Sequence, residues 1–448
     1  MQKANIFTGN KRKISSLREI SNGTGKKHMA APSSVIGSRQ AARQLSEKQG
    51  KGMSAHCERT ENGMSSRFGN MPTRLGRDEI TKVQLERLNL VLAREKERGG
   101  FYKNLPERVD GLEELHELPF TTEDDLRKYG GSMLLVSQRD IEKIISGETS
   151  GTTGEGKRVF YTAGDCENTV LLFMDGISEM VSPGERVLVC MPYSGGNSLG
   201  ALISEAVRRL GAEPIEAGCG LTYSSLIKRI TEENPESYIG FPQPLLAVLR
   251  LAGRMSLRKA LISGDTCAAS VIEGMEQILN PENKDPAGVQ LSVFPHYGSR
   301  EMCLGGAIAC SAHKGMHLRE GHVIAEIIDD AGNVLPDGEY GELVITTIGM
   351  EAQPLIRYRT GDRTRIISGA CPCGRETLRL DNVTRLSGDL SEPDNRMFAD
   401  PEVIDYKAYY LPGDDKTKGP RIEVLLKKDV SDTDRPFYPA KRHIVTVV

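Results

Sequence analysis

Residues 186–241 read RVLVCMPYSGGNSLGALISEAVRRLGAEPIEAGCGLTYSSLIKRITEENPESYIGF. Short aliphatic and β-branched runs alternate there with segments of helical spacing, in the order 186–191, 200–210, 212–216, 226–233 and 237–241. A strand followed by a helix and a second strand forms a βαβ unit, in which the two strands are parallel. The stretch therefore predicts an α/β fold built on a mainly parallel sheet.

Two helices are expected upstream of this stretch. Between Asp78 and Lys96, leucine and valine recur at helical spacing, and Asp78 is the expected N-cap. A second helix is expected after Thr121–Asp124, because threonine caps helix starts and acidic residues favour the first turn.

The sequence pattern changes from about Gly315, where strand-like runs follow one another without helical segments between them. Strand-like runs at 323–328, 341–347 and 355–360 are separated by Asp-Gly and Gly turns. Such turns join neighbouring antiparallel strands, so an antiparallel, meander-like region is expected here. The last sixty or so residues are mixed and weakly patterned.

The first part of the chain has a different composition. Through residue 75 it holds fourteen Lys/Arg against four Asp/Glu, a charge of +10, so the rest carries −13 of the total −3. We expect residues 1–76 to be a disordered basic tail or an over-extended start, with Met53, Met64 or Met71 as the true first residue. A transit peptide is less favoured, because acidic residues remain and no amphipathic arginine pattern occurs.

Charge, hydropathy and cysteine usage limit the class of protein. The mildly acidic body argues against nucleic-acid binding. The sequence contains neither an apolar run of membrane-spanning length nor the h-region of a secretory signal. Its nine cysteines are odd in number and lack framework spacing, which favours a reducing, cytoplasmic environment. We expect no membrane partner, and a homodimer stays open.

A loop rich in glycine and hydroxyl groups is the sharpest local feature, Thr149-Ser150-Gly151-Thr152-Thr153-Gly154-Glu155-Gly156-Lys157. Its glycines allow a close backbone approach, and its hydroxyls and lysine donate to a polyanionic phosphate chain. A flexible surface loop is less favoured, because strands are expected on both sides, at Ile141–Ile145 and Arg158–Thr162. Gly151–Lys157 also has P-loop spacing, but Arg158 stands where the Mg²⁺-binding Ser or Thr should follow.

Four motifs, in order, resemble those of the acyl-adenylate-forming superfamily. They are the loop at 149–157, Tyr297-Gly298-Ser299-Arg300-Glu301, Gly338-Glu339-Tyr340-Gly341-Glu342-Leu343 and Tyr358-Arg359-Thr360-Gly361-Asp362. Within that superfamily the chain is most similar to the phenylacetate–coenzyme A ligase group, through phrases at 84–88, 118–122, 326–329 and 352–362. The resemblance covers roughly residues 77–390 and only weakly the remainder.

The resemblance implies a two-domain architecture. Residues 77–385 are expected to form a large N-terminal domain of layered α/β sheets with a small β-barrel-like subdomain. Residues 386–448 are expected to form a short, mobile α+β C-terminal lid. The usual Gly-rich lid sequence is missing, so this lid is predicted to be shortened and divergent, or adenylation to be impaired.

The resemblance also implies a reaction in two steps. ATP activates a carboxylic acid, with an aromatic acid favoured, as an acyl-AMP with release of pyrophosphate, and coenzyme A then takes the acyl group with release of AMP. Glu301 is expected to hold Mg²⁺, and Lys157 to neutralise phosphate. Lys441 is the candidate lid lysine, although another register places Pro439 there. Nucleotide contacts are implied for Thr149, Ser150, Gly151, Thr152, Thr153, Gly154, Lys157, Asp265, Tyr297, Gly298, Ser299 and Asp362.

Four residues are candidates for the substrate pocket. Phe241 and Pro242 occupy the place of a segment that lines the acyl pocket, and a core role for Phe241 is an equal alternative. His296 precedes the tyrosine motif and is either a satisfied polar group or a contact to substrate or pyrophosphate. Arg300 replaces the usual Ser or Thr, and it either binds an acidic substrate or points away.

These departures keep two other functions open. One is an adenylyltransferase without thiol transfer, and the other is a nucleotide-binding homologue that has lost full catalysis. A P-loop kinase is a more distant alternative.

Cys310, His317, Cys371 and Cys373 form a second constellation. Three thiolates and an imidazole suit a tetrahedral structural zinc ion. Some members of the phenylacetate ligase group resemble this chain in carrying these four positions as a zinc site. Buried reduced thiols are the alternative, and Cys303 and His313 are substitute ligands if the loop folds otherwise.

Overall fold

The structure is a computed structural model and describes residues 75–146, 156–265, 267–279, 292–387, 389–415, 417, 419–437 and 445–446. The predictions for the N-terminal tail fall on residues outside this set, apart from its last two positions, and stay predictions. Of the helices in the described ranges, none has both the length and the apolar character needed to cross a bilayer.

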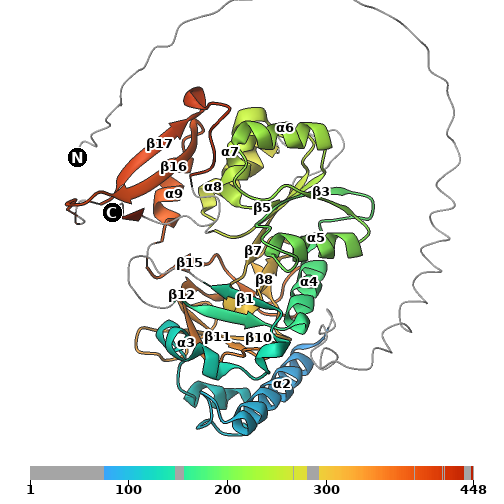
Figure 1. The fold of residues 1–448 in the computed structure, drawn as a ribbon, viewed down its shortest axis with the longest axis vertical. Helices are drawn as coiled ribbons and strands as arrows, with labels where there is room; N and C mark the ends of the chain where they lie inside the picture. The colour runs from blue at the N-terminus through green and yellow to red at the C-terminus, as the bar shows by residue number, and fades with distance from the viewer. Residues whose placement is uncertain are drawn as a thin grey trace, which may run out of the picture. The chain divides into compact units, whose positions relative to one another are not determined.

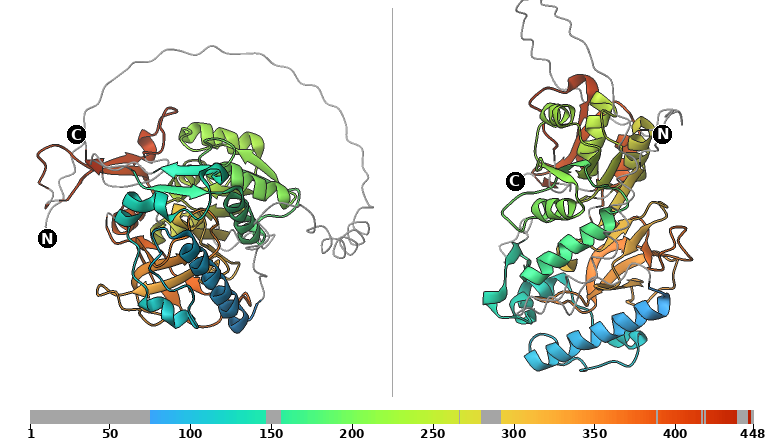
Figure 2. Two further views of the ribbon diagram at one scale, coloured as in Figure 1. Left: turned by 60° about the horizontal axis from the view of Figure 1, so that its bottom comes forward. Right: turned by 90° about the vertical axis from the view of Figure 1, so that its right-hand side faces the viewer.

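Helix α2 (Arg77–Arg98) confirms the helix expected at 78–96. Its N-cap is Gly76 rather than Asp78: Gly76 has an extended backbone, and its N–H donates to Glu79 Oε2 at 3.0 Å. Asp78 lies in the first turn, where its charge favours the helix dipole. Arg87 donates to the Gly321 carbonyl. This contact places α2 beside the strand that begins at Val323, as Figure 2 shows.

Helix α3 (Glu123–Tyr129) begins where the Thr-Thr-Glu-Asp sequence predicts a start. The Asp125 N–H donates to Thr122 Oγ1 at 3.1 Å, and the Thr122 N–H donates to Asp125 Oδ2 at 2.9 Å. This reciprocal cap satisfies two N–H groups at the helix start. Short 3₁₀ helices surround α3: η2 (Leu112–Glu117), η3 (Gly130–Met133) and η4 (Gln138–Asp140).

Strands β1 (Lys143–Ser146) and β2 (Arg158–Tyr161) confirm the strands expected on both sides of the phosphate loop. They pair antiparallel, with Ser146 opposite Arg158. The pairing therefore brings together the two ends of the loop, whose residues 147–155 lie outside the described set.

The predicted parallel sheet is confirmed as half of a nine-stranded mixed sheet with the order β13-β14-β9-β8-β7-β6-β5-β3-β4. Its parallel strands are β3 (Arg186–Cys190), β4 (Glu213–Glu216), β5 (Ser237–Gly240), β6 (Lys259–Ile262) and β7 (Ser292–Tyr297). Its antiparallel strands are β8 (Ala307–Ala309), β9 (Met316–Leu318), β13 (Ile366–Ile367) and β14 (Arg379–Leu380).

Helices cover both faces of the parallel half (Figure 1). One face packs on α4 (Ala163–Ile177) and α5 (Leu199–Arg209), and the other on α6 (Tyr223–Glu233), α7 (Pro242–Ala252) and α8 (Ala269–Leu279). Side chains of β3 alternate between these cores: Val187 and Val189 join the first, and Leu188 and Cys190 the second. Burial on both faces explains the continuous apolar runs of the parallel strands.

The antiparallel region is also confirmed. Strands β10 (Val323–Ile328), β11 (Gly341–Thr347), β12 (Tyr358–Thr364) and β15 (Thr384–Arg385) form a four-stranded antiparallel sheet in that order. An Asp-Gly turn and a Gly turn precede β11, as the sequence indicated.

The C-terminal segment contains helix α9 (Ser391–Phe398) and a small sheet of β16 (Val403–Tyr410), β17 (Arg421–Leu426) and β18 (Val445–Thr446), with η8 (Lys427–Asp429) after β17. Phe398, Ile404 and Tyr406 are buried in the same core as α7 and α8, and Figure 1 shows β16 beside these helices. The mobility expected for this segment stays a prediction.

Candidate active site

A buried ion pair joins the phosphate-loop lysine to the glutamate of the tyrosine motif. Lys157 Nζ lies 2.6 Å from Glu301 Oε1, and the two side chains are only 13% and 6% exposed. Lys157 immediately precedes β2, and Glu301 lies on η6 (Arg300–Met302), which follows β7. Two of the predicted catalytic residues, 144 positions apart in sequence, therefore meet in space.

The Lys157 ammonium has further oxygen partners. Glu123 Oε1 lies 3.3 Å away on the first residue of α3, and Nζ donates to the Tyr358 hydroxyl at 3.3 Å. Tyr358 begins β12 and is buried. The ammonium thus lies among oxygen atoms from three other parts of the chain.

Opposing effects act on the Glu301 carboxyl. Burial raises its pKa, but the neighbouring Lys157 ammonium and, more weakly, the Arg300 guanidinium lower it, and the net pKa is below its ordinary value. Glu301 is therefore ionised at neutral pH. An ionised, buried carboxylate that already forms an ion pair with a cation fits the chemistry of a magnesium ligand.

A second pair joins the ends of β7 and β12. The Tyr297 hydroxyl donates to Asp362 Oδ2 at 2.7 Å. Burial raises the pKa of Tyr297 well above its usual range, and the Asp362 carboxylate adds to the rise, so the phenol keeps its proton. The two residues that the resemblance places at the adenine and the ribose are therefore direct neighbours.

Gly298 allows this arrangement sterically. A Cβ at this position would lie 2.5 Å from the Leu304 carbonyl oxygen and 2.8 Å from Gly305 Cα. The chain folds back here, since the Leu304 N–H donates to the Ser299 carbonyl at 2.9 Å and the Gly306 N–H donates to the Tyr297 carbonyl at 3.0 Å. Ser299 Oγ is buried without a hydrogen-bond partner among the described residues.

Arg300 lies close to the Lys157–Glu301 pair. Its carbonyl accepts a hydrogen bond from the Tyr161 hydroxyl at 2.5 Å. Burial raises the pKa of Tyr358 and of Tyr161, and the positive charge of Arg300 opposes both rises. The positive charge of Arg300 therefore acts on three groups of the site, and its two alternative roles, binding an acidic substrate or pointing away, stay predictions.

Phe241, Pro242 and Asp265 follow neighbouring parallel strands. Phe241 is the N-cap of α7 and Pro242 its first residue, a position where proline costs no helical hydrogen bond. The Phe241 ring packs on Gly264, where a Cβ would lie 2.5 Å from the ring, and the half-buried Asp265 follows directly. Phe241 is buried and belongs to the core, so its core role is observed.

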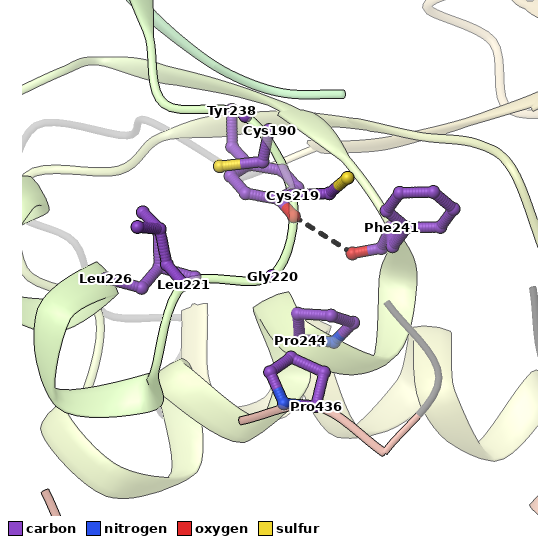
Figure 3. Close-up of a pocket in the computed structure, with 10 residues that line it drawn as sticks. Cys190, Cys219, Gly220, Leu221, Leu226, Tyr238, Phe241, Pro244 and Pro436 are labelled. Atoms are coloured by element: carbon purple, nitrogen blue, oxygen red, sulfur yellow. Dashed lines mark hydrogen bonds between the residues drawn. The ribbon is translucent and has the colours of Figure 1, made fainter. Parts of the chain in front are cut away.

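A small apolar pocket lies beside Phe241 (Figure 3). Its walls come from the ends of β3 and β5, the segment after β4, and the starts of α6 and α7, together with Pro436 of the C-terminal segment. The Tyr238 hydroxyl donates to the Phe241 carbonyl at 3.0 Å at its edge. The lining residues are Cys190, Gly218, Cys219, Gly220, Leu221, Leu226, Tyr238, Phe241, Pro244 and Pro436.

His296 is enclosed within the fold. Its Nδ1 lies 2.6 Å from Ser263 Oγ, and its ring packs on Phe173 with centroids 5.1 Å apart. Burial lowers the pKa of His296 to about 3, so the ring is neutral at physiological pH. Its Nε2 has no hydrogen-bond partner among the described residues. The satisfied-polar-group reading therefore holds for Nδ1 only.

The ligand atoms of Cys310, His317, Cys371 and Cys373 all lie within 4.8 Å of one another. Cys310 Sγ and Cys371 Sγ are 3.6 Å apart, and Cys373 Sγ lies 3.3 Å from His317 Nε2. The arrangement fits a metal ion held by three thiolates and one imidazole. Neither substitute ligand belongs to this group: Cys303 lies near Asp165, and the His313 ring packs on Phe294.

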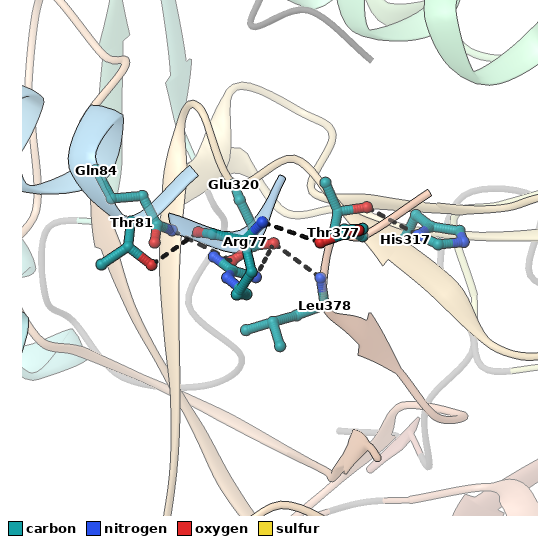
Figure 4. A network of polar contacts seen from close by, with 8 residues as sticks. Arg77, Thr81, Gln84, His317, Glu320, Thr377 and Leu378 are labelled. Carbon is teal, nitrogen blue, oxygen red and sulfur yellow. Dashed lines mark hydrogen bonds and ion pairs between the residues drawn. The ribbon is translucent and has the colours of Figure 1, made fainter. Parts of the chain in front are cut away.

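A polar network ties this cluster to the start of α2 (Figure 4). His317 Nδ1 lies 2.8 Å from Thr377 Oγ1, which leaves Nε2 facing the thiols. The neighbouring Leu378 N–H donates to Glu320 Oε2 at 2.8 Å, and Arg77 forms two 2.8 Å hydrogen bonds with the same carboxylate. An imidazole oriented through its second nitrogen is typical of metal ligands.

The remaining predicted residues lie outside the described set. They are Thr149, Ser150, Gly151, Thr152, Thr153 and Gly154 of the phosphate loop and the lid candidate Lys441 with its alternative Pro439. Their predicted roles stay predictions.

Comparison with known proteins agrees with this geometry. The family described as AMP-binding enzyme matches residues 149–351, which contain both Lys157 and Glu301. Residues 149–351 belong to the AMP-binding superfamily. The chain is 27% identical over 393 residues to the phenylacetate-coenzyme A ligase of Thermus thermophilus, covering 81% of this chain and 84% of the relative. It is 29% identical over 334 residues to the Escherichia coli enzyme of that name, covering 70% and 72%.

Solved structures of a CoA ligase share the fold. A 2-hydroxyisobutyryl-CoA ligase in the postadenylation state superimposes with a TM-score of 0.65 at 19% identity, covering 76% of this chain and 77% of that chain. The same ligase in the thioesterification state gives a TM-score of 0.62 at 20% identity, covering 79% and 80%.

Sequence reasoning missed three residues at these sites. Glu123 was expected only as a first-turn acid, and its contact with Lys157 depends on how α3 packs near β12. Tyr161 carried no signal, because single hydroxyl residues are common in strands. Thr377 could have been suspected from its place just after the Cys-Pro-Cys-Gly turn.

Proposed function

We propose that the chain is an AMP-forming acid–coenzyme A ligase that activates an aromatic carboxylic acid. The contact between Lys157 and Glu301 carries this proposal, because it brings a phosphate-neutralising cation and a metal-binding carboxylate to one point. The Tyr297–Asp362 pair supplies polar groups for a nucleoside near that point. Relatives named phenylacetate-coenzyme A ligase over most of the chain support the same activity.

In the first half-reaction, an oxygen of the acid's carboxylate attacks the α-phosphorus of ATP and forms an acyl phosphate bond. The bond from that phosphorus to the bridging oxygen breaks, and pyrophosphate leaves. The protein contributes positioning and charge neutralisation rather than covalent chemistry. Lys157, with Arg300 nearby, neutralises phosphate charge, and loop residues 149–154 donate to phosphate oxygens.

Mg²⁺, when bound, neutralises the phosphates that develop charge as pyrophosphate leaves. Glu301 is the described residue that would hold it, because its carboxylate is ionised and already faces a cation. Asp362 would accept hydrogen bonds from the ribose hydroxyls, and the Tyr297 ring would pack on the adenine. These roles follow the superfamily motifs at matching positions.

In the second half-reaction, the coenzyme A thiolate attacks the acyl carbonyl, and the bond to the AMP oxygen breaks. Residues 386–448 are proposed to act as the lid domain for this step, with Lys441 assisting adenylation. The apolar pocket beside Phe241 is proposed to receive the acyl group, since its aliphatic, aromatic and thiol walls suit an uncharged ring.

The metal site is proposed to be structural zinc. Four protein ligands close the coordination sphere and leave no open position for substrate. The network from Thr377 to Arg77 links the site to the start of α2, so the ion would stabilise the fold around the sheet edge.

An adenylyltransferase without thiol transfer is a second candidate. It is favoured by the packing of Phe398, Ile404 and Tyr406 into the core of α7 and α8, since this burial opposes a rearrangement of the C-terminal segment between the two half-reactions.

Carboxylate-dependent exchange of pyrophosphate into ATP tests the function. A panel of aryl and aliphatic acids should reveal at least one acid that supports exchange, and AMP should then form in proportion to added coenzyme A. A folded protein that binds ATP but exchanges pyrophosphate with no acid would contradict the ligase proposal. AMP release that ignores coenzyme A would favour the adenylyltransferase.

A further inference from the structure

Glu123 is a second carboxylate at the Lys157 ammonium that no motif accounts for. Its Oε1 lies 3.3 Å from Lys157 Nζ, compared with 2.6 Å for Glu301 Oε1. The two carboxylates differ in environment, because the Glu123 side chain is 49% exposed and that of Glu301 is 6% exposed. The ammonium therefore has a close, buried partner in Glu301, the inner carboxylate, and a more distant, partly exposed partner in Glu123, the outer carboxylate.

The start of α3 fixes this outer partner. Arg127 lies 3.1 Å from Glu123 Oε1, one turn further along the helix. The other two acids of that turn have different contacts: Asp124 pairs with Arg127 at 2.8 Å, and Asp125 accepts from the Thr122 cap. Among these three acids, Glu123 is the one that forms an ion pair with Lys157.

Binding of a divalent cation creates a conflict at the inner carboxylate. Glu301 cannot keep a close ammonium and also coordinate a magnesium ion without bringing two positive charges together. If the largely buried Lys157 ammonium left Glu301 before phosphate oxygens reached it, its charge would be poorly solvated and unpaired, which is costly. A carboxylate within reach on the solvent side removes this cost.

We propose that Glu123 is a positioning residue that receives the Lys157 ammonium when Glu301 turns to a divalent cation. Lys157 then stays paired throughout and remains beside the phosphate chain. The inference rests on the proposed function, since it takes Mg²⁺ and ATP as the ligands. It adds a role for a residue outside the adenylation motifs.

The test is the Mg²⁺ concentration that gives half-maximal binding of a non-hydrolysable ATP analogue to the full chain, measured by calorimetry. In Glu123→Gln the lysine loses its alternative partner, so Mg²⁺ competes less well for Glu301. The Mg²⁺ midpoint should rise about two- to fivefold, the range expected for a partly exposed ion pair. Glu123→Asp should recover part of the shift.

Asp124→Asn is the matched control. It removes the same charge from the same helical turn and from the same Arg127, but Asp124 pairs with Arg127 and not with Lys157. Its Mg²⁺ midpoint should equal that of the unmodified chain, whereas a merely structural effect would lower the melting temperature of both variants equally and leave the midpoint unchanged. Equal midpoints in Glu123→Gln and Asp124→Asn would overturn the proposal.

Binding of the analogue needs no acid substrate, so two failures can be told apart. A Glu123→Gln shift without pyrophosphate exchange by any acid would support the role of Glu123 and contradict the ligase function. Pyrophosphate exchange together with an unchanged Mg²⁺ midpoint in Glu123→Gln would support the ligase function and contradict the role of Glu123. Failure of the unmodified chain to bind the analogue would overturn both.

Discussion

Glu95 on α2 is a buried acid whose removal should change the pH dependence of stability. Its side chain is 1% exposed, and neither carboxylate oxygen has a hydrogen-bond partner among the described residues. Burial raises the pKa of Glu95 from its ordinary value of 4.5 to about 8, and Arg94 opposes the rise only weakly. At about 1.4 kcal/mol per pKa unit, ionising Glu95 inside the fold costs on the order of 5 kcal/mol.

The sign follows from proton linkage. The folded chain binds this proton more tightly than the unfolded chain, so the unfolding free energy falls as pH rises from about 4.5 to about 8 and levels off above that. Glu95→Gln keeps a neutral side chain of similar shape at every pH. The variant should match the unmodified chain at pH 5 and exceed its unfolding free energy by several kcal/mol at pH 9.

Urea unfolding at pH 5, 7 and 9 measures the difference. Glu97→Gln is the matched control, because Glu97 is exposed on the same helix, and it should change stability by less than about 0.5 kcal/mol at each pH. If the Glu95→Gln and unmodified curves run parallel from pH 5 to pH 9, the reasoning about an unpaired buried carboxylate is refuted.

Two further predictions concern the metal cluster and Arg300. Chelator-free protein should contain about one equivalent of zinc by elemental analysis; Cys373→Ser should lose it and Cys219→Ser, at an exposed thiol outside the cluster, should keep it, whereas less than half an equivalent in the unmodified chain would contradict the site. Arg300→Thr should weaken ATP binding about tenfold by removing a cation beside the phosphates, measured by calorimetry; unchanged ATP affinity with an altered acid preference would instead place the guanidinium at the acid.

The layout of the fold could be predicted because it depends on local patterns. Alternating aliphatic and helical segments at 186–241 predicted the parallel strands, and turn residues after Gly315 predicted the antiparallel sheet. The start of α2 was misplaced by two residues, since Asp78 and Gly76 are both acceptable near a helix start and only the backbone angles distinguish them.

The site was predictable only where a motif marks it. Motif resemblance assigned Lys157 and Glu301, and the structure joins them. Cysteine and histidine spacing gave the four residues of the metal cluster, whose geometry agrees. Glu123 could not be predicted, because its contact with Lys157 depends on the tertiary placement of α3, and acids in a first helical turn are commonly solvated.

Buried hydrogen bonds and buried apolar side chains hold the C-terminal segment against α6, α7 and α8. The Tyr406 hydroxyl donates to Asp394 at 2.6 Å, and the Tyr223 hydroxyl of α6 donates to Asp405 at 2.6 Å, all within buried surroundings. A rotation of this segment must break the second bond and bring Phe398, Ile404 and Tyr406 into water.

At about 1.5–3 kcal/mol for each large apolar side chain, lifting these three residues costs about 5–9 kcal/mol, so the undocked form would be rarer than the docked one by about 10³-fold or more. A catalytic cycle that alternates between docked and undocked forms would then have this opening as its slow step. The rate of turnover would then depend on how strongly the C-terminal segment packs on α7 and α8, at a distance from the reacting atoms.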